Sequence, residues 1–188
     1  LRVLLDRDAF WAGMEIPDLL QESTRAIVQI LRVDFCALRE LSPDECVLEQ
    51  RAFTDSASLS PRLAQEVIPA GRGSPSGYSV SMGEPVVFED LEKETRFEIN
   101  EWLKSSGFTS GIAVPISIGG KPFGALSVFT RTPRSFGEND AHFLQSMANI
   151  LAAAIQRQRA EAVTQRALEE ARTANRAKSA FLSRMSHE

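Results

Sequence analysis

An uninterrupted run without glycine or proline extends from Asn139 to the end of the chain. Alanine, glutamine, arginine and glutamate dominate this run, and all four favour helix. A helix from Asn139 to Met185 would be about 70 Å long at 1.5 Å per residue. Its stretch up to Gln156 has an apolar stripe suited to packing on a folded domain, whereas the stretch beyond Gln156 is mostly polar. We therefore expect one long helix with two differently packed stretches.

The polar stretch of this helix keeps only a thin apolar stripe. Its members are Ala160, Val163, Ala167, Leu168, Ala171, Leu182 and Met185. A helix this long and polar is not stable alone, so a two-stranded parallel coiled coil is the expected solution. The spacing does not keep one strict heptad from Ala148 to Met185, so a local change of winding is expected. The chain should form a homodimer through its terminal helices.

The bulk composition is that of a globular protein. Hydrophobic residues make up 43% and charged residues 24% of 188 residues, and the net charge is −4. Acids and bases are interspersed, so no nucleic-acid partner is expected. Cys36 and Cys46 provide no disulfide framework, which fits a reducing compartment. No apolar run reaches the roughly 20 residues of a membrane span, and neither a signal peptide nor an initiating methionine is present. We expect a cytoplasmic fragment of a longer protein.

Upstream of the long helix, short helices and strands alternate. Helices are expected over residues 3–14, 17–31, 62–66, from about 76, and over 99–104. Strands are expected over residues 35–41, 47–53, 86–88, 111–118 and 122–130. Gly119 and Gly120 provide the two-residue turn of a hairpin, and Pro115 predicts a bulge or a locally unpaired position in it. This order predicts an α+β fold with an antiparallel sheet.

Several short pieces along the chain together resemble a GAF domain over about residues 16–157. They are Ile68-Pro69 and the glycines after it, Gly83-Glu84-Pro85-Val86-Val87 through Asp90, Arg96-Phe97, Gly107 to Ile116, the Gly124 strand, and Arg134-Ser135-Phe136 leading into Asp140 and Phe143. The resemblance implies a six-stranded antiparallel sheet with helices on both faces, a small-molecule pocket on one face, and dimerisation through terminal helices. Residues 1–15 would then be a helical linker.

The end of the chain is similar to the phosphoacceptor motif of sensor histidine kinases. Lys178 to Glu188 matches Lys-Ser-x-Phe-Leu-x-x-Met-Ser-His-Glu at every fixed position. Residues 158–177 would be a signalling helix and 178–188 the start of the dimerisation and phosphoacceptor domain. The resemblance implies that His187 accepts phosphate from ATP, with Glu188 as neighbouring acid or base. Without the motif, His187 would be read as an exposed histidine on a helix.

The same resemblance implies the other cofactors and partners. ATP and Mg would belong to a kinase domain outside this sequence, so the fragment alone should be inert and hold no cofactor or metal. A response regulator would be the partner of the full-length kinase.

GAF relatives often line their ligand cavity at the positions of Phe88, Asp90, Phe97 and Trp102, although Phe97 and Trp102 would equally suit a closed core. The ligand itself is not identified by the sequence.

Other chemistries are less well matched by the residues. His142 has no second candidate haem ligand, so a surface position is expected. Cys36 suits a core strand and Cys46 an exposed turn, and no resolving pair supports methionine sulfoxide reduction. Residues 92–108 contain neither Cys nor His, which argues against covalent bilin attachment, and the pattern of cyclic-nucleotide-binding relatives is not visible. Gly71-Arg72-Gly73-Ser74 is expected to form a loop beside the pocket rather than a phosphate loop.

Two hypotheses follow. In the first, the chain is the sensory GAF fragment of a two-component histidine kinase, and it transmits a ligand or partner signal through a dimeric coiled coil to His187. In the second, it is a non-catalytic GAF dimerisation module that binds no small molecule.

Overall fold

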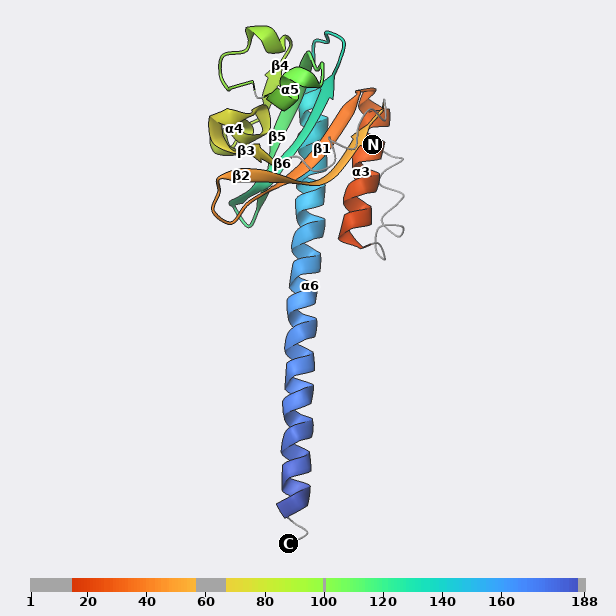
Figure 1. Cartoon of the computed structure of the whole chain (residues 1–188). Coiled ribbons are helices and arrows are strands. Elements are labelled where there is room, and N and C mark those ends of the chain that lie inside the picture. The colour runs from red at the N-terminus through yellow and green to blue at the C-terminus, as the bar shows by residue number, and fades with distance from the viewer. Residues whose placement is uncertain (1–14, 57–66, 100, 186–188) are drawn as a thin grey trace. The chain divides into compact units, whose positions relative to one another are not determined.

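The computed structural model describes residues 15–56, 67–99 and 101–185. Six strands lie in this part of the chain: β1 (Phe35–Leu41), β2 (Val47–Asp55), β3 (Val67–Pro69), β4 (Val86–Phe88), β5 (Ser110–Ile118) and β6 (Lys121–Thr130). They form one antiparallel sheet in the order β3-β2-β1-β6-β5-β4 (Figure 1). The predicted α+β fold with a six-stranded antiparallel sheet is confirmed.

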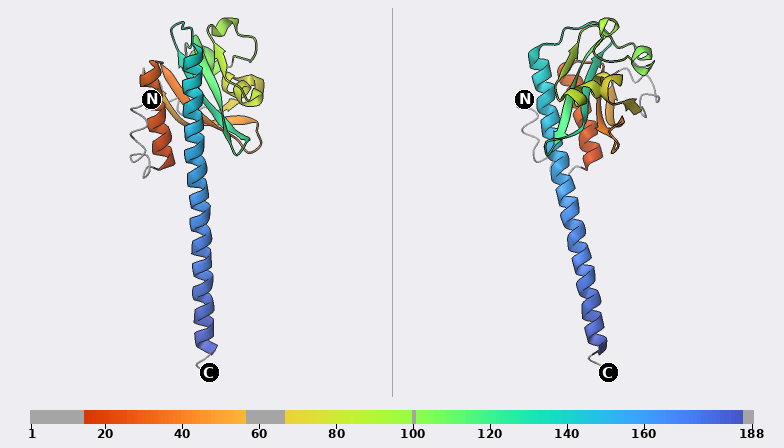
Figure 2. Two further views of the ribbon diagram at one scale, coloured as in Figure 1. Left: turned by 180° about the vertical axis from the view of Figure 1, so that it is seen from behind. Right: turned by 90° about the vertical axis from the view of Figure 1, so that its left-hand side faces the viewer.

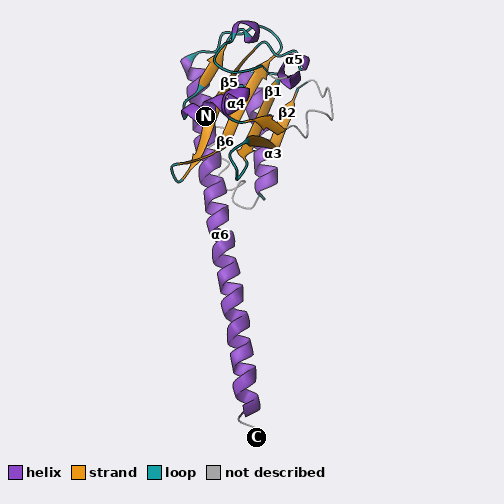
Figure 3. Cartoon of the chain, turned by 60° about the vertical axis from the view of Figure 1, so that its left-hand side comes forward, coloured by secondary structure: helices purple, strands orange, loops and turns teal. Residues whose placement is uncertain are grey.

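Helices cover both faces of this sheet. They are α3 (Ile16–Leu31), α4 (Pro75–Met82), α5 (Glu101–Ser105) and α6 (Glu138–Met185), with short 3₁₀ turns η2 (Gly71–Gly73) and η3 (Leu91–Lys93). α4 and α5 lie on one face, which we call the α4 face. α3 and the beginning of α6 lie on the opposite face (Figures 2 and 3).

The bounds of α3 follow from its sequence. Pro17 occupies the first turn, where its missing N–H costs nothing, and Asp18 adds a favourable negative charge there. The helix ends where Arg32 adopts a left-handed conformation, with φ of 51°, and its N–H donates to the carbonyl of Val28. Gln21 Nε2 donates to the carbonyl of Phe53 over 2.7 Å. This contact joins α3 to β2.

The β5–β6 hairpin forms as predicted. Gly119 and Gly120 have φ of 59° and 76°, a region that glycine occupies without strain. Pro115 lies opposite Ala125, and the register shifts one residue pair beyond, between Ile116 and Ser117. β4 pairs only with residues 111–113 of β5, so Pro115 lies outside that ladder. A proline is tolerated there because no β4 carbonyl opposite it requires a donor.

One other element differs from the expectation, and two match it to within two residues. β3 was not predicted as a strand, because three residues are too few to show an alternating pattern, yet Val67–Pro69 pairs with residues 47–49 of β2. The helix expected from about residue 76 begins at Pro75, and Ser74 Oγ caps it by accepting from Gly77 N over 2.9 Å. The helix expected over 99–104 is α5. The helices predicted over 3–14 and 62–66 lie outside the described residues.

The long helix predicted from Asn139 to Met185 is confirmed as α6, which is 48 residues long. Contacts divide the chain into two compact units: the domain unit, ending at Ala152, and the distal helix unit, beginning at Ala153. In the domain unit, α6 buries Leu144, Met147, Ala148, Leu151 and Ala152. None of the described helices combines the length and apolarity that crossing a bilayer requires.

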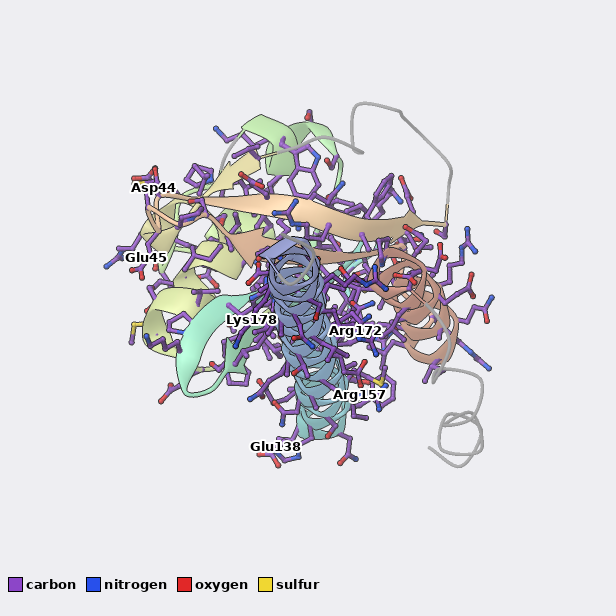
Figure 4. All side chains as sticks on the ribbon, turned by 90° about the horizontal axis from the view of Figure 1, so that it is seen from below. Asp44, Glu45, Glu138, Arg157, Arg172 and Lys178 are labelled. Atoms are coloured by element: carbon purple, nitrogen blue, oxygen red, sulfur yellow. The ribbon has the colours of Figure 1, made fainter. Side chains whose placement is uncertain are left out.

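Within the distal helix unit, every side chain from Arg159 to Ser179 is exposed. The charged side chains of Arg157, Arg172 and Lys178 project outward from the helix (Figure 4). Val163 and Leu168 remain 67% and 44% exposed. This stretch therefore has no buried side of its own.

Candidate functional site

The register of the sheet arranges the side chains of the α4 face in rows. Side chains alternate between faces along a strand, so directly opposite partners lie on the same face. Phe35 lies opposite Phe129, Phe129 opposite Gly111, and Gly111 opposite Phe88. A Cβ added at Gly111 would come within 2.4 Å of the Phe129 ring, so glycine here makes room for the aromatic side chains. We call Phe35, Phe129 and Phe88 the aromatic row.

Two further rows cross the same face. The small-residue row joins Ala37 to Ser127 and Ser127 to Ala113, all buried. The polar row has Arg39 between Gln50 and Ala125. The face therefore changes from aromatic, through small, to polar side chains along the strand direction.

Three of the predicted pocket residues meet in one cluster on the aromatic row. Phe97 packs edge-on against Phe88 with ring centroids 5.6 Å apart. Trp102 packs edge-on against Phe35 at 5.7 Å. Phe108 and Phe129 are also members of this cluster, with centroids 5.3 Å apart. Aromatic pairs at these separations contribute packing energy beyond the area they bury.

Asp90, the fourth predicted pocket residue, lies apart from this cluster. Its carboxylate accepts from Glu92 N over 3.1 Å at the start of η3 and pairs with Lys93 over 2.7 Å. The Lys93 hydrogen bond lowers the pKa of the carboxyl. Asp90 and its neighbour Glu89 line an open cleft of about 690 Å³ whose floor includes Phe108. Asp90 therefore caps a 3₁₀ turn beside an acidic surface cleft.

Arg39 was not among the predicted site residues, although it is fully buried. Its Nη1 donates to Ser127 Oγ over 3.4 Å and its Nη2 to Gln50 Oε1 over 3.2 Å. The guanidinium carbon is 5.1 Å from the centroid of the Trp102 ring, a cation–π distance. A signal was present in the sequence, because Arg39 shares its strand parity with Phe35 and Ala37, which face inward.

On α4 and α5, two buried polar side-chain atoms have no hydrogen-bond partner within the described part of the chain. They are Ser76 Oγ on α4 and Trp102 Nε1 on α5. Ser79, one turn after Ser76, is fully satisfied: its Oγ contacts the carbonyls of Glu84 at 2.7 Å and Ala113 at 3.1 Å. Buried polar groups are paired in most proteins, so these two exceptions require an explanation.

An ion pair closes one end of the aromatic cluster. Arg131 donates from Nη1 and Nη2 to the two carboxylate oxygens of Asp55 over 3.0 and 3.1 Å. Its guanidinium carbon lies 4.8 Å from the centroid of the Phe108 ring, and its backbone N–H donates to Asp34 Oδ2 over 2.7 Å. The side chain of Asp55 is only 4% exposed. A bidentate pair in this position fixes the ends of β1, β2 and β6.

The remaining candidate residues have ordinary positions. Cys36 is buried, and burial raises the pKa of its thiol, whereas Cys46 and His142 are exposed. Gly71–Gly73 forms the η2 turn and Ser74 caps α4. Within the described ranges, no group of three or more His, Cys, Asp and Glu side chains is arranged to hold a metal ion. His187 and Glu188 lie outside the described residues.

The sequence over residues 13–156 matches the family described as GAF domain. Because this match covers most of the chain, the chain belongs to the GAF family, a class of signalling and sensory modules. The match ends in the first half of α6. No protein of curated function matches the chain at a significant level.

Solved structures share the fold. A GAF domain from a phosphoenolpyruvate-protein phosphotransferase of Coxiella burnetii is 20% identical, with a TM-score of 0.70 over 81% of this chain and 89% of its own. The free methionine-R-sulfoxide reductase of Neisseria meningitidis, solved with its substrate, is 21% identical, with a TM-score of 0.66 over 80% and 85%. A fragment of a methyl-accepting chemotaxis protein is 19% identical, with a TM-score of 0.65 over 76% and 90%.

Proposed function

We propose that this chain is the sensory and transmitting fragment of a two-component sensor histidine kinase. A small molecule on the α4 face would change the packing of α6 in a homodimer and thereby the access of a kinase domain to His187. The observation that carries this proposal is the continuity of α6, which begins in the domain unit and continues without a break to Met185, two residues before His187.

A continuous helix suits transmission because its backbone hydrogen bonds oppose local bending. A rotation or shift at Leu144 or Leu151 can then be passed along the helix. Binding must favour one of two arrangements of the paired helices, since a ligand with equal affinity for both would change nothing. In the proposed mechanism, the signal is transmitted because ligand binding is coupled energetically to the arrangement of the paired helices.

At the end of the helix, the proposed chemistry is phosphoryl transfer. The His187 imidazole would attack the γ-phosphorus of ATP and displace ADP, and Glu188 would take or hold the ring proton. Such transfer depends mainly on positioning and charge stabilisation, which a kinase domain with ATP and Mg would supply. The phosphoryl group would then pass to a response regulator. Because ATP is the proposed phosphate donor, we propose that this fragment lies in the cytoplasm.

The test uses the full-length protein that carries this sequence. Labelling with γ-phosphate-labelled ATP should be lost in His187→Gln and retained in His142→Gln. His142 is a matched control because it is the other histidine of the sequence and is exposed. Undiminished labelling of the His187 variant would refute the assignment of the phosphoacceptor.

One observation favours the second hypothesis, a GAF dimerisation module that binds no small molecule. The aromatic cluster already fills part of the α4 face, with ring centroids 5.3–6.2 Å apart. A panel of metabolites followed by thermal unfolding separates the two functions, since a compound that binds only the folded state raises the melting temperature. An unchanged melting temperature across the panel would support the empty module.

A further inference from the structure

We infer that the ligand of the α4 face is a small carboxylate held by Arg39, Trp102 and Ser76. This inference rests on the proposed sensory function and specifies its ligand class. It begins from Ser76 Oγ and Trp102 Nε1, two buried polar side-chain atoms without a hydrogen-bond partner in the described part of the chain. Burying a polar group without a hydrogen bond is destabilising. Two such groups on one face of the sheet indicate a bound molecule that forms the missing hydrogen bonds.

The three groups lie over the same part of the sheet. Trp102 is placed directly by its contact with the Arg39 guanidinium, 5.1 Å from the ring centroid. Ser76 lies one helical turn before Val80, and Val80 packs in a cluster with Ala125. Ala125 is directly opposite Arg39 on the adjacent strand. We therefore infer that α4 carries Ser76 toward the polar row, to which α5 brings Trp102.

The donor pattern defines the chemistry of the missing partner. An indole N–H and a guanidinium can only donate hydrogen bonds, and a serine hydroxyl can also donate. The ligand must therefore present several acceptor oxygens close together. A carboxylate does so with two coplanar oxygens and an opposite charge, the geometry that a guanidinium fork matches best. Burial of the guanidinium strengthens this attraction because little water screens it.

The rows limit the size of the ligand. The aromatic row is packed, whereas Ala37, Ser127 and Ala113 in the next row carry short side chains. A carboxylate at Arg39 would direct its remaining atoms over these small residues and end against the aromatic cluster. The ligand we infer is therefore an acid of a few carbon atoms rather than a fatty acid.

The experiment uses the full chain with Trp11→Phe, so that Trp102 is the only tryptophan. Sodium formate, acetate, lactate and succinate are compared with acetamide, a neutral analogue of acetate, and with sodium phosphate, at constant ionic strength. A binding carboxylate at 100 times its dissociation constant should raise the melting temperature by about 5–10 °C. It should also shift the Trp102 indole N–H resonance, whereas acetamide should do neither.

Variants separate a ligand contact from a structural role. Ser76→Ala and Trp102→Phe remove the atoms without partners, so the melting temperature without ligand should stay the same or rise. The affinity for the carboxylate should fall tenfold or more, because each variant loses a hydrogen bond to a charged group. Ser79→Ala is the matched control. It should lower the melting temperature without ligand, since the Ser79 hydroxyl hydrogen-bonds to two carbonyls, and leave the affinity unchanged.

The outcomes distinguish this inference from the proposed function. Binding of acetamide as tight as that of acetate, or of phosphate alone, would overturn the carboxylate class while leaving a sensory pocket in place. Carboxylate binding that Ser76→Ala and Trp102→Phe leave intact would overturn the assigned site. If no compound of this panel or of the wider metabolite panel binds, both the inference and the sensory function fail.

Discussion

The two stretches of α6 have the same backbone conformation and opposite surroundings. Between Glu138 and Ala152 the helix buries an apolar stripe that includes Leu144 and Leu151, at 0% and 1% exposure. From Arg159 to Ser179 every side chain is exposed. The first stretch is held by the domain it packs on. The second has hydrogen bonds along the helix, such as the one from Thr164 Oγ1 to the carbonyl of Ala160.

The difference in burial between the two stretches of α6 indicates that the exposed stretch requires a packing partner. Isolated helices are only marginally stable in water, and most helices in proteins are held by packing of an apolar face. The exposed stretch has such a face in reduced form, at Ala160, Val163, Ala167 and Ala171, spaced three, four and four residues apart. That spacing departs from a strict heptad and approaches an eleven-residue repeat. We propose that a second copy of the helix covers it.

The largest expected effect is a difference in the free energy of unfolding between leucine-to-alanine substitutions in the two stretches of α6. Leu151→Ala should lower the free energy of unfolding by about 2–5 kcal/mol, because it leaves a cavity in a packed interior. Leu168→Ala, at a residue that is 44% exposed, should change the unfolding of the domain by less than about 0.5 kcal/mol. Urea unfolding in the Trp11→Phe background, followed by the fluorescence of Trp102, measures both. Equal effects would mean that the domain packing extends along the whole helix.

A smaller effect should appear in association. Val163→Glu places a charge in the proposed seam, so the dimer dissociation constant should rise tenfold or more. Gln165→Glu is the control, because residue 165 lies on the opposite side of the helix and adds the same charge. Sedimentation equilibrium measures the dissociation constant. If both variants dimerise like the native chain, the seam lies elsewhere.

Much of this fold follows from local sequence signals, and α6 and the β5–β6 hairpin are the clearest cases. A long run without glycine or proline and a Gly119-Gly120 turn between alternating strands admit few alternatives. β3 shows the opposite. Val67–Pro69 is a strand only because residues 47–49 provide its partner. A three-residue edge strand is determined by tertiary pairing, which a local pattern does not contain.

The candidate site was less accessible to sequence reasoning. Phe88, Phe97 and Trp102 were placed by family resemblance and do share one cluster, whereas Asp90 lies at a 3₁₀ turn outside it. Arg39 was not predicted as a site residue, because an arginine near the end of an apolar strand is normally expected to reach solvent. Its burial depends on the register between β1, β2 and β6, and on α5 placing Trp102 against it. Those are long-range contacts.

The smallest expected effects concern two ion pairs, one in the domain unit and one in the distal helix unit. Unfolding at acidic pH should distinguish the contributions of the two pairs to stability. In the domain unit, Glu94 Oε2 accepts from Arg96 Nη2 over 2.6 Å, and Glu94 Oε1 accepts from the backbone N–H groups of Thr95 and Arg96. The Arg96 side chain, followed by these backbone bonds, lowers the pKa of Glu94 from 4.5 to about 2. In the distal helix unit, Arg157 and Glu161 are 3.8 Å apart with side chains 64% and 69% exposed.

A carboxyl whose pKa is depressed by folding stabilises the native state above its unfolded pKa and loses that contribution as the pH falls through its folded pKa. The Glu94 contribution should therefore be complete above about pH 4.5 and disappear towards pH 2. Glu94→Gln should flatten this part of the acid unfolding curve. Glu161→Gln should leave it unchanged, because an exposed i,i+4 pair contributes about 0.5 kcal/mol or less and the order Arg before Glu is the weaker one. If instead Glu161→Gln altered the acid limb as strongly as Glu94→Gln, the distal pair would have to be desolvated, which only a partner helix covering it could bring about.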